Sequence, residues 1–194
     1  MNVLHLDTSA LGTYSISRQL TAAIVGQLQR DGVASLVSYR DLAAEPLPHW
    51  LPNPDPASDN ALRDEAVLQQ FLDADIVVLG APMYNFAITT QLKAWLDRVL
   101  VAGRTFRYGP NGPEGLAGGK RVIVASSRGG KYSEGPAAAM DFQEPYLRTV
   151  LGFIGIADIE FVRAEGMAMG DDAKQAALQA AHATIGDLAL RKAA

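Results

Sequence analysis

Residues 3–18 read Val3-Leu4-His5-Leu6-Asp7-Thr8-Ser9-Ala10-Leu11-Gly12-Thr13-Tyr14-Ser15-Ile16-Ser17-Arg18. The apolar run at the start of this stretch predicts a β-strand over Val3 to Thr8, and the apolar stripe of Leu20, Ile24 and Leu28 predicts that a helix follows. The turn between them is rich in Ser and Thr side chains and contains no lysine. A strand that passes through a polar turn into a helix is the first unit of a parallel sheet flanked by helices.

The rest of the chain repeats this alternation of short apolar runs and stretches of helical period. A stripe of apolar side chains between Leu92 and Leu100 predicts one further helix, starting near Thr89 or Thr90, and the alanine-rich segment from Asp171 predicts the last one. We expect a doubly wound, flavodoxin-like sheet of order 2-1-3-4-5 with helices on both faces, in a single domain of residues 1–194. The expected strands are Val3 to Thr8, Ala34 to Tyr39, Ile76 to Ala81, Val122 to Ser126 and Ile159 to Ala164.

Two segments depart from the alternation. Leu42 to Asn60 carries five of the ten prolines, which predicts a long loop because proline lacks a backbone donor. Its Trp50 is either a cover for a ligand or partner subunit, or an anchor packed on the surface. The turn residues and β-forming residues between Gly103 and Gly119 predict a small hairpin.

The amino-acid composition argues against several classes of function. A chain of 194 residues with 48% hydrophobic residues suits one compact domain, and a net charge of -4 without a basic run argues against a nucleic-acid surface. The absence of cysteine excludes disulfides, thiolate metal sites and cysteine nucleophiles. We also expect no transmembrane span and a cytoplasmic location, since polar residues interrupt the apolar stretches and no signal-type leader precedes the first strand.

The first polar turn predicts a phosphate site. A helix N-terminus offers N–H groups without helical partners, and the hydroxyls of Ser9, Ser15 and Ser17 would add uncharged donors. This set suits a phosphate monoester held without a countercharge, and neither G-x-x-x-x-G-K-[ST] nor G-x-G-x-x-G is present in the turn. Ordinary helix capping by serine is the alternative.

Two further loops follow strands and are expected at the same edge of the sheet. Ala81-Pro82-Met83-Tyr84-Asn85-Phe86 would flank a flat ring with sulfur and aromatic groups, while Asn85 bonds its rim; the alternative is that Met83 and Phe86 belong to the core. Ser126-Ser127-Arg128-Gly129-Gly130 would let the backbone approach a planar ligand, or would be only a turn.

These features together resemble the FMN-dependent NADH-azoreductases, a family of flavodoxin-like quinone reductases whose members are sometimes labelled acyl-carrier-protein phosphodiesterases. The similarity extends over nearly the whole chain. Its motifs are Ala81-Pro82-Met83-Tyr84-Asn85-Phe86, Thr105-Phe106-Arg107-Tyr108, Asn111-Gly112-Pro113-Glu114-Gly115-Leu116, Ser127-Arg128-Gly129-Gly130 and Leu151-Gly152-Phe153-Ile154-Gly155.

The resemblance implies a bound FMN, with NADH, or alternatively NADPH, as the electron donor. Hydride would pass through the flavin N5 to a quinone or azo compound in a ping-pong reaction, without a catalytic side chain or a metal. It also implies a homodimer with active sites at the interface. The implied phosphate contacts are Ser9, Ser15, the main-chain amide of Ile16, and Ser17. The implied ring contacts are Met83, Tyr84, Asn85, Phe86, Ser127, Arg128, Gly129 and Gly130.

Some expectations go beyond the implied cofactor site. Tyr108 and Phe153 are candidates for the substrate pocket, because one lies in the hairpin insertion and the other in a glycine-flanked turn. Arg104, Arg107 and Arg128 are candidates for attracting the nicotinamide phosphates. Some relatives have a polar residue in place of Ile16, and many have a longer proline-rich loop than residues 42–60, which bears on substrate range.

Three alternatives stand beside the oxidoreductase. An electron carrier like flavodoxin shares the fold, but such carriers tend to be more acidic than a charge of -4. Phosphodiester hydrolysis is the second alternative, but no cluster of metal-ligating residues that would support it is apparent in the sequence. A purely structural role leaves the three loops unexplained.

Overall fold

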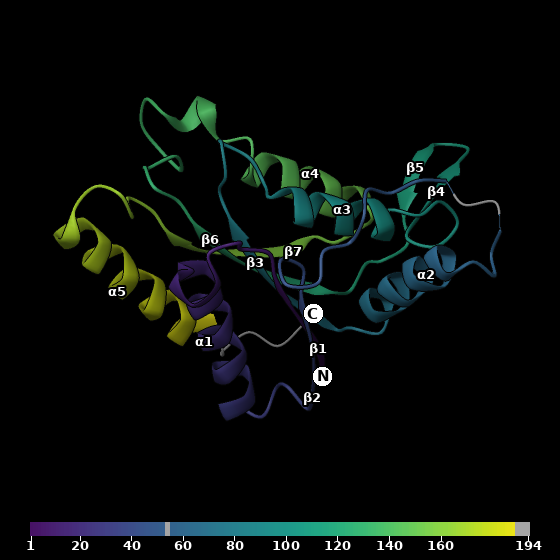
Figure 1. The fold of residues 1–194 in the computed structure, drawn as a ribbon, viewed down its shortest axis with the longest axis horizontal. Coiled ribbons are helices and arrows are strands. Elements are labelled where there is room, and N and C mark those ends of the chain that lie inside the picture. Colours follow the sequence, from purple (N-terminus) through teal and green to yellow (C-terminus); the bar gives the residue numbers. More distant parts are fainter. Residues whose placement is uncertain (53–54, 189–194) are drawn as a thin grey trace.

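The computed structural model describes residues 1–52 and 55–188. Its main sheet has five parallel strands in the order β2-β1-β3-β6-β7, which corresponds to the expected 2-1-3-4-5 order once the hairpin strands are left out (Figure 1). The strands are β1 (Asn2–Asp7), β2 (Leu36–Asp41), β3 (Ile76–Pro82), β6 (Arg121–Ser127) and β7 (Asp158–Ala164).

The second strand begins two residues later than expected. The backbone N–H groups of Val33 and Ala34 both donate to the carbonyl of Leu28, at 2.9 and 3.0 Å, in the turn that ends the first helix. Ala34 is therefore part of the helix C-terminus and not of β2. The other four strands lie within one residue of the predicted bounds.

Five α-helices alternate with the strands, as predicted. Side-chain caps explain where three of them begin: Ser15, Ser58 and Thr89 accept hydrogen bonds from N–H groups in the first turns. The Thr89 cap confirms the predicted start of the third helix. None of the helices in the described part of the chain has the length and apolar character of a membrane span. The helices are α1 (Ile16–Arg30), α2 (Asp59–Leu72), α3 (Thr90–Val99), α4 (Glu144–Phe153) and α5 (Asp171–Leu188).

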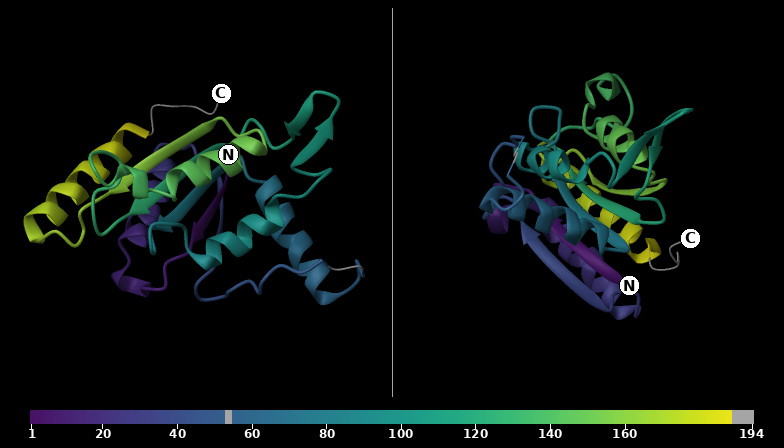
Figure 2. Two further views of the ribbon diagram at one scale, coloured as in Figure 1. Left: turned by 90° about the horizontal axis from the view of Figure 1, so that it is seen from above. Right: turned by 90° about the vertical axis from the view of Figure 1, so that its right-hand side faces the viewer.

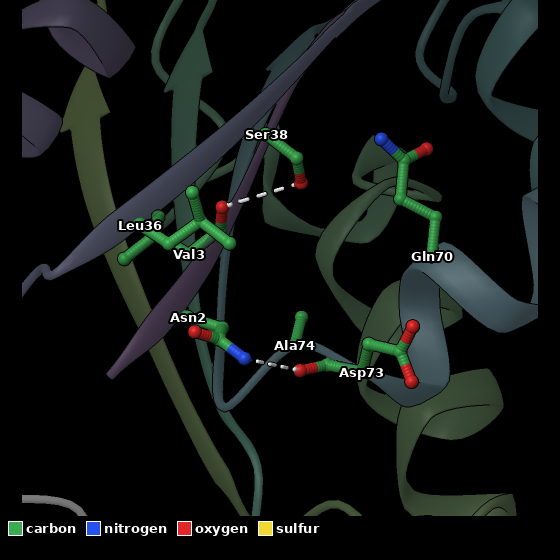
Figure 3. A pocket seen from close by; sticks show the side chains of 7 residues that line it. All are labelled: Asn2, Val3, Leu36, Ser38, Gln70, Asp73 and Ala74. Atoms are coloured by element: carbon green, nitrogen blue, oxygen red, sulfur yellow. Dashed lines mark hydrogen bonds between the residues drawn. The ribbon is translucent and has the colours of Figure 1, made fainter.

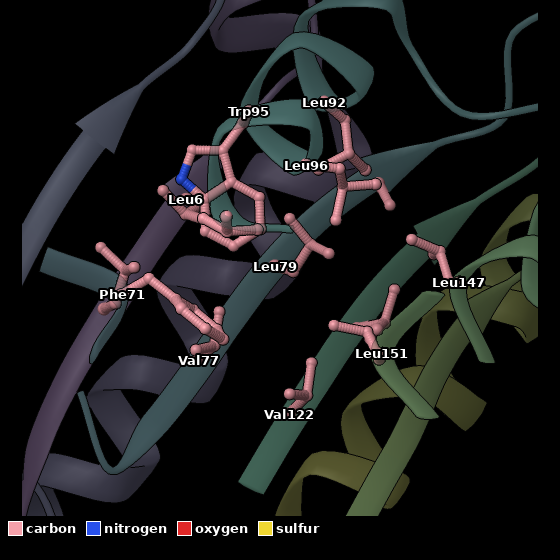
Figure 4. Close-up of a cluster of buried hydrophobic side chains, with 14 of the residues drawn as sticks. Leu6, Phe71, Val77, Leu79, Leu92, Trp95, Leu96, Val122, Leu147 and Leu151 are labelled. Carbon is pink, nitrogen blue, oxygen red and sulfur yellow. The ribbon is translucent and has the colours of Figure 1, made fainter. Parts of the chain in front are cut away.

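The buried side chains form two clusters. Neighbouring strand residues alternate between them, so that Val77 belongs to one cluster and Val78 to the other. The first cluster includes residues of α2, α3 and α4, and Figure 4 shows Trp95 of α3 beside Phe71 of α2, with ring centroids 5.7 Å apart. The second cluster includes residues of α1 and α5.

The predicted hairpin is present as β4 (Phe106–Gly109) and β5 (Gly112–Gly115). It lies at the end of the molecule opposite the start of α5, as Figure 1 and the left view of Figure 2 show. The N–H of Ala117 donates to the carbonyl of Ile154 at 2.9 Å, which ties the base of the hairpin to the C-terminus of α4. The hairpin thus packs at the end of the sheet where β6 and β7 begin, which is opposite to their carboxyl ends.

The proline-rich segment between β2 and α2 is a long loop, as predicted; its residues 53 and 54 lie outside the described residues. Asp41 fixes the start of the loop, because its Oδ1 accepts from the N–H groups of Ala43 and Ala44 at 3.0 Å each. Trp50 is 46% exposed and lines a groove against Leu68 of α2. This position favours the surface anchor over a cover for the three polar loops.

Candidate functional site

The carboxyl ends of β1, β3 and β6 meet at one cavity of about 170 Å³. All three loops that the sequence singled out contribute to it, as expected for the ligand edge of a doubly wound sheet. The lining residues are Ser9, Leu11, Tyr14, Ser15, Ile16, Pro82, Met83, Tyr84, Ser127, Arg128, Gly129 and Met167. Four residues implied by the resemblance are not among them: Ser17, Asn85, Phe86 and Gly130.

The first loop presents buried, uncharged donors at a helix N-terminus. The hydroxyl of Ser15 caps α1 by accepting from the N–H of Arg18 at 3.3 Å, and it lies 3.1 Å from the hydroxyl of Ser17. The N–H groups of Ile16 and Ser17 stand in the first turn, where a helix provides no carbonyl for them. Capping by Ser15 therefore does not exclude anion binding at this turn, and the donor set fits a phosphate group.

Tyr84 connects the first loop with the second. Its hydroxyl lies 3.2 Å from the hydroxyl of Ser9 and accepts from the N–H of Ala10 at 3.2 Å. Tyr84 also exchanges two backbone hydrogen bonds with Ala87, at 3.0 and 3.1 Å. The two walls of the cavity are thereby held together by one phenol.

The turn between Tyr84 and Ala87 carries backbone strain. Asn85 and Phe86 have φ angles of 49° and 71°, in the left-handed region that is costly for phenylalanine. The carbonyl of Phe86 is held by the N–H of Phe142 at 3.0 Å. Strain of this kind clusters at ligand-binding loops, so both residues shape the turn beside the cavity although neither lines it.

Arg128 in the third loop has a different environment from the one expected. Its side chain is fully buried and forms ion pairs with Asp141, Glu144 and Glu165, at 2.9, 2.8 and 3.1 Å. The expectation that its guanidinium attracts nicotinamide phosphates is therefore wrong. Arg128 lines the cavity as part of a loop that its own ion pairs hold in place.

The two remaining candidates for that attraction are paired on the surface. Arg104 binds Glu65 at 3.0 Å, and Arg107 binds Glu114 at 2.8 Å. Exposed pairs of this kind are weak, so both arginines can still exchange partners.

Gln143 joins the second and third loops, although no sequence pattern singles it out. Its side-chain N–H donates to the carbonyl of Ala81 at 2.9 Å, and its Oε1 accepts from the hydroxyl of Ser126 at 2.9 Å. The residue is completely buried. A glutamine before a helix carries no sequence signal that distinguishes this role from solvation.

Other lining residues were also missed. Leu11 and Tyr14 lie in the first turn, but only its Ser and Thr hydroxyls were considered as phosphate donors. Met167 follows β7, whose carboxyl end lies at the same edge of the sheet. The rule that located the other loops therefore applied to residues after Ala164 as well.

The substrate-pocket candidates lie together but apart from the cavity. The ring of Phe106 lies 5.7 Å from that of Tyr108 and 4.7 Å from that of Phe153. This aromatic cluster of Phe106, Tyr108 and Phe153 belongs to the hairpin and the end of α4, at the edge where β6 and β7 begin. Within one chain, neither candidate is among the residues that line the cavity.

A second hollow lies at the other end of β1, between β2 and α2 (Figure 3). Two of its polar side chains bond other residues of its wall: Asn2 donates to the carbonyl of Asp73 at 3.2 Å, and Ser38 donates to that of Val3 at 3.4 Å. Among the described residues, no group of three or more His, Cys, Asp or Glu side chains is placed to hold a metal ion. The three-loop cavity is therefore the stronger candidate site.

Glu165 makes the third loop sensitive to acid. Burial by itself raises the pKa of Glu165, but hydrogen bonds from the Ser133 hydroxyl and the Tyr132 N–H, together with Arg128, lower it below its ordinary value. Because the pKa is lower in the folded chain than in the unfolded one, this stabilisation is present at neutral pH. It is lost as the pH falls through the folded-state pKa.

Replacing Glu165 by glutamine should lower the free energy of unfolding by about 1–3 kcal/mol at neutral pH, because charge-assisted hydrogen bonds are lost. The difference from the wild type should shrink as the pH falls below about 4. Urea unfolding across this range measures it, with the exposed Glu134→Gln as control. A difference that does not change with pH would refute the role of the Glu165 charge.

Comparison with known proteins agrees with this geometry. Residues 1–188 match the model of a family described by its flavodoxin-like fold. The chain is 57% identical over 198 residues to the FMN-dependent NADH:quinone oxidoreductase of Sinorhizobium fredii, which covers 96% of both chains. It is 58% identical over 191 residues, again with 96% of both chains covered, to the FMN-dependent NADH:quinone oxidoreductase 1 of Xanthomonas euvesicatoria pv. vesicatoria.

The solved structures agree in fold. An azoreductase from Bacillus anthracis superposes with a TM-score of 0.86 at 29% identity, over 97% of this chain and 98% of the other. With near-complete coverage of relatives that are more than half identical, the resemblance stated from the motifs is confirmed. The chain belongs to the flavodoxin-like family of FMN-dependent NADH-azoreductases and quinone reductases.

Proposed function

We propose that this protein binds FMN and transfers electrons from NADH to quinones and azo compounds. One observation carries the proposal: the uncharged donors of the first turn line the same cavity as parts of the two other loops. The names of the relatives, FMN-dependent NADH:quinone oxidoreductases and azoreductases, support it.

In this proposal the chain's residues bind and orient the cofactor. Ser9, Ser15, Ser17 and the N–H of Ile16 hold the phosphate, whose charge the dipole of α1 favours. Bound FMN would supply the hydride-accepting centre, so that no side chain has to act as acid, base or nucleophile. The ring is assigned to Met83, Tyr84, Asn85, Phe86, Ser127, Arg128, Gly129 and Gly130.

The walls of the cavity suit a planar apolar ligand. Leu11, Met83 and Met167 supply apolar surface that excludes water, and Tyr84 adds an aromatic side chain. The buried ion pairs of Arg128 keep its charge away from the ligand. The proposal includes a ping-pong exchange, in which NADH, or NADPH, leaves before the acceptor binds beside the ring.

The proposal includes a homodimer. A second copy would let the aromatic cluster of Phe106, Tyr108 and Phe153 approach the cavity that it does not reach within one chain. Tyr108 is 76% exposed, which fits a side chain that contacts a partner subunit or a substrate. Tyr108 and Phe153 remain the proposed substrate contacts on this basis.

The wider architecture is part of the same proposal. The division of the buried side chains into two clusters supports a doubly wound sheet with helices on both faces, in one domain over residues 1–194. The cytoplasmic location expected from the sequence stays a prediction.

The visible spectrum of the purified protein tests the proposed function. We expect a yellow solution, or a colourless one that takes up added FMN, and we expect NADH to bleach it without oxygen. Excess quinone should then sustain many turnovers of NADH oxidation, whereas an electron carrier would stop after a single reduction. Folded protein that does not bind FMN under native conditions contradicts the proposal. The same assay with NADPH compares the two electron donors.

A further inference from the structure

Arg18 contacts the first loop but is not among the residues that line the cavity. It is the third residue of α1, and its side chain turns back so that Nη2 and Nε donate to the carbonyl of Ser9, at 2.8 and 3.3 Å. This carbonyl belongs to the loop whose hydroxyls and N–H groups are assigned to the phosphate. Because the guanidinium binds the carbonyl oxygen of Ser9, this acceptor is held away from the position assigned to the phosphate.

The other side of the guanidinium is fixed to the end of β2. Nη1 and Nη2 donate to the two carboxylate oxygens of Asp41, at 2.6 and 2.7 Å. Asp41 is itself held by the N–H groups of Ala43 and Ala44. Arg18 therefore connects the loop after β1 with the turn after β2, and only a planar fork with several donors can make both contacts.

Charge gives Arg18 a second role. Asp7 is 4% exposed, and its Oδ2 lies 3.7 Å from Nη1 of Arg18. The Oδ1 of Asp7 accepts from the Thr21 hydroxyl at 2.8 Å, and its Oδ2 accepts from the Tyr39 hydroxyl at 3.0 Å. Two carboxylates thus lie within 3.7 Å of a guanidinium that is bound to the loop expected to hold a phosphate dianion.

The ionised state of this group is favoured by its contacts. The hydrogen bonds from Arg18 hold the pKa of Asp41 below its ordinary value. Burial raises the pKa of Asp7, but its contacts with His5, Thr21 and Tyr39 outweigh burial, so that this pKa is lowered as well. Removing the guanidinium would take away the positive charge that lies close to both carboxylates, and so make the surroundings of the loop assigned to the phosphate more negative.

We propose that Arg18 is a positioning residue for the phosphate end of the cofactor, acting by holding the Ser9 carbonyl and by compensating Asp7 and Asp41. The inference rests on the proposed function, because it names what fixes the loop assigned to the FMN phosphate. It predicts a contribution that depends on the phosphate and not on the isoalloxazine ring.

Riboflavin, which lacks the phosphate, separates these two parts. We expect Arg18→Gln to raise the Kd for FMN at least tenfold, roughly the value of one charge-assisted interaction, and to change the Kd for riboflavin less than about twofold. Arg18→Lys keeps the charge without the fork and should fall between wild type and Arg18→Gln. Arg30→Gln changes an exposed arginine at the other end of α1, whose Nη2 donates to Gln27 Oε1 at 2.6 Å, and should leave both constants unchanged. Flavin fluorescence titration measures each Kd.

Each outcome decides the matter. Equal weakening of FMN and riboflavin binding would mean that Arg18 stabilises the fold in general, and unchanged FMN binding would mean that it does not act on the phosphate; either result overturns the proposal. If Arg18→Gln does not fold, the ratio of the two constants in Arg18→Lys decides in the same way. Wild-type protein that binds neither flavin overturns the proposed function itself, a result distinct from the other two.

Discussion

Replacing Ile16 by proline is expected to weaken FMN binding at least tenfold, roughly the cost of one lost hydrogen bond to a charged group, while riboflavin binding stays nearly constant. Ile16 is the first residue of α1, where proline is well tolerated because the N–H has no helical partner. Ser15 before it has φ -76° and ψ 122°, an extended conformation that a following proline permits. The substitution therefore removes one N–H that the proposal assigns to the phosphate, and little else in the backbone.

Ile16→Ala is the matched control. It removes the same side chain, which packs partly buried against the cluster that includes α1, but it keeps the N–H. We expect both variants to lose similar stability, about 1 kcal/mol each, and only the proline variant to lose FMN affinity. Thermal unfolding and fluorescence titration measure the two quantities. If both variants bind FMN as tightly as the wild type, the amide of Ile16 does not contact the phosphate.

Most of the fold could be predicted from the sequence because local patterns decide it. The strand at Ile76 is uniformly apolar, as expected for a central parallel strand, and Thr89 carries the capping hydroxyl that starts α3. The start of β2 was misplaced because Ala34 is apolar enough to read as strand, while its N–H is taken by the carbonyl of Leu28. A competing hydrogen bond of this kind leaves no trace in residue type.

From the sequence, the candidate site could be predicted only for residues that follow the carboxyl ends of the strands. Loops that follow parallel strands must meet at one edge, so Ser15, Met83 and Gly129 were placed together correctly. Arg128 was misjudged, because its three carboxylate partners lie between 13 and 37 residues away in the chain and only folding brings them to it. The contacts of Gln143 and Arg18 were missed for the same reason: Gln143 donates to the carbonyl of Ala81 and Arg18 to the carboxylate of Asp41, and each of these partners lies on another segment of the chain.

The hairpin gives the second large prediction. Replacing Gly115 by alanine is expected to lower the free energy of unfolding by about 3 kcal/mol, the upper range for overpacking. A Cβ at this position would lie 2.1 Å from the backbone nitrogen of Gly155 and 2.3 Å from the carbonyl carbon of Ile154. These are main-chain atoms, which cannot rotate away as a side chain would, so the hairpin must shift from the end of α4.

Gly109→Ala in the same hairpin is the control, because its Cβ would meet its nearest neighbours at 3.6 and 4.0 Å, which is ordinary contact. Urea unfolding should show a large loss for Gly115→Ala and a small one for Gly109→Ala. The hairpin lies at the opposite end of the strands from the three loops, so FMN affinity of the folded protein should stay within about twofold in both variants, below the effect of one hydrogen bond.

The proposed role of Tyr108 adds a kinetic expectation: displacing the hairpin should lower kcat/KM for quinones without loss of flavin. Full stability in Gly115→Ala would show that the hairpin does not pack this closely, and unchanged kinetics in a destabilised variant would remove Tyr108 from the substrate pocket.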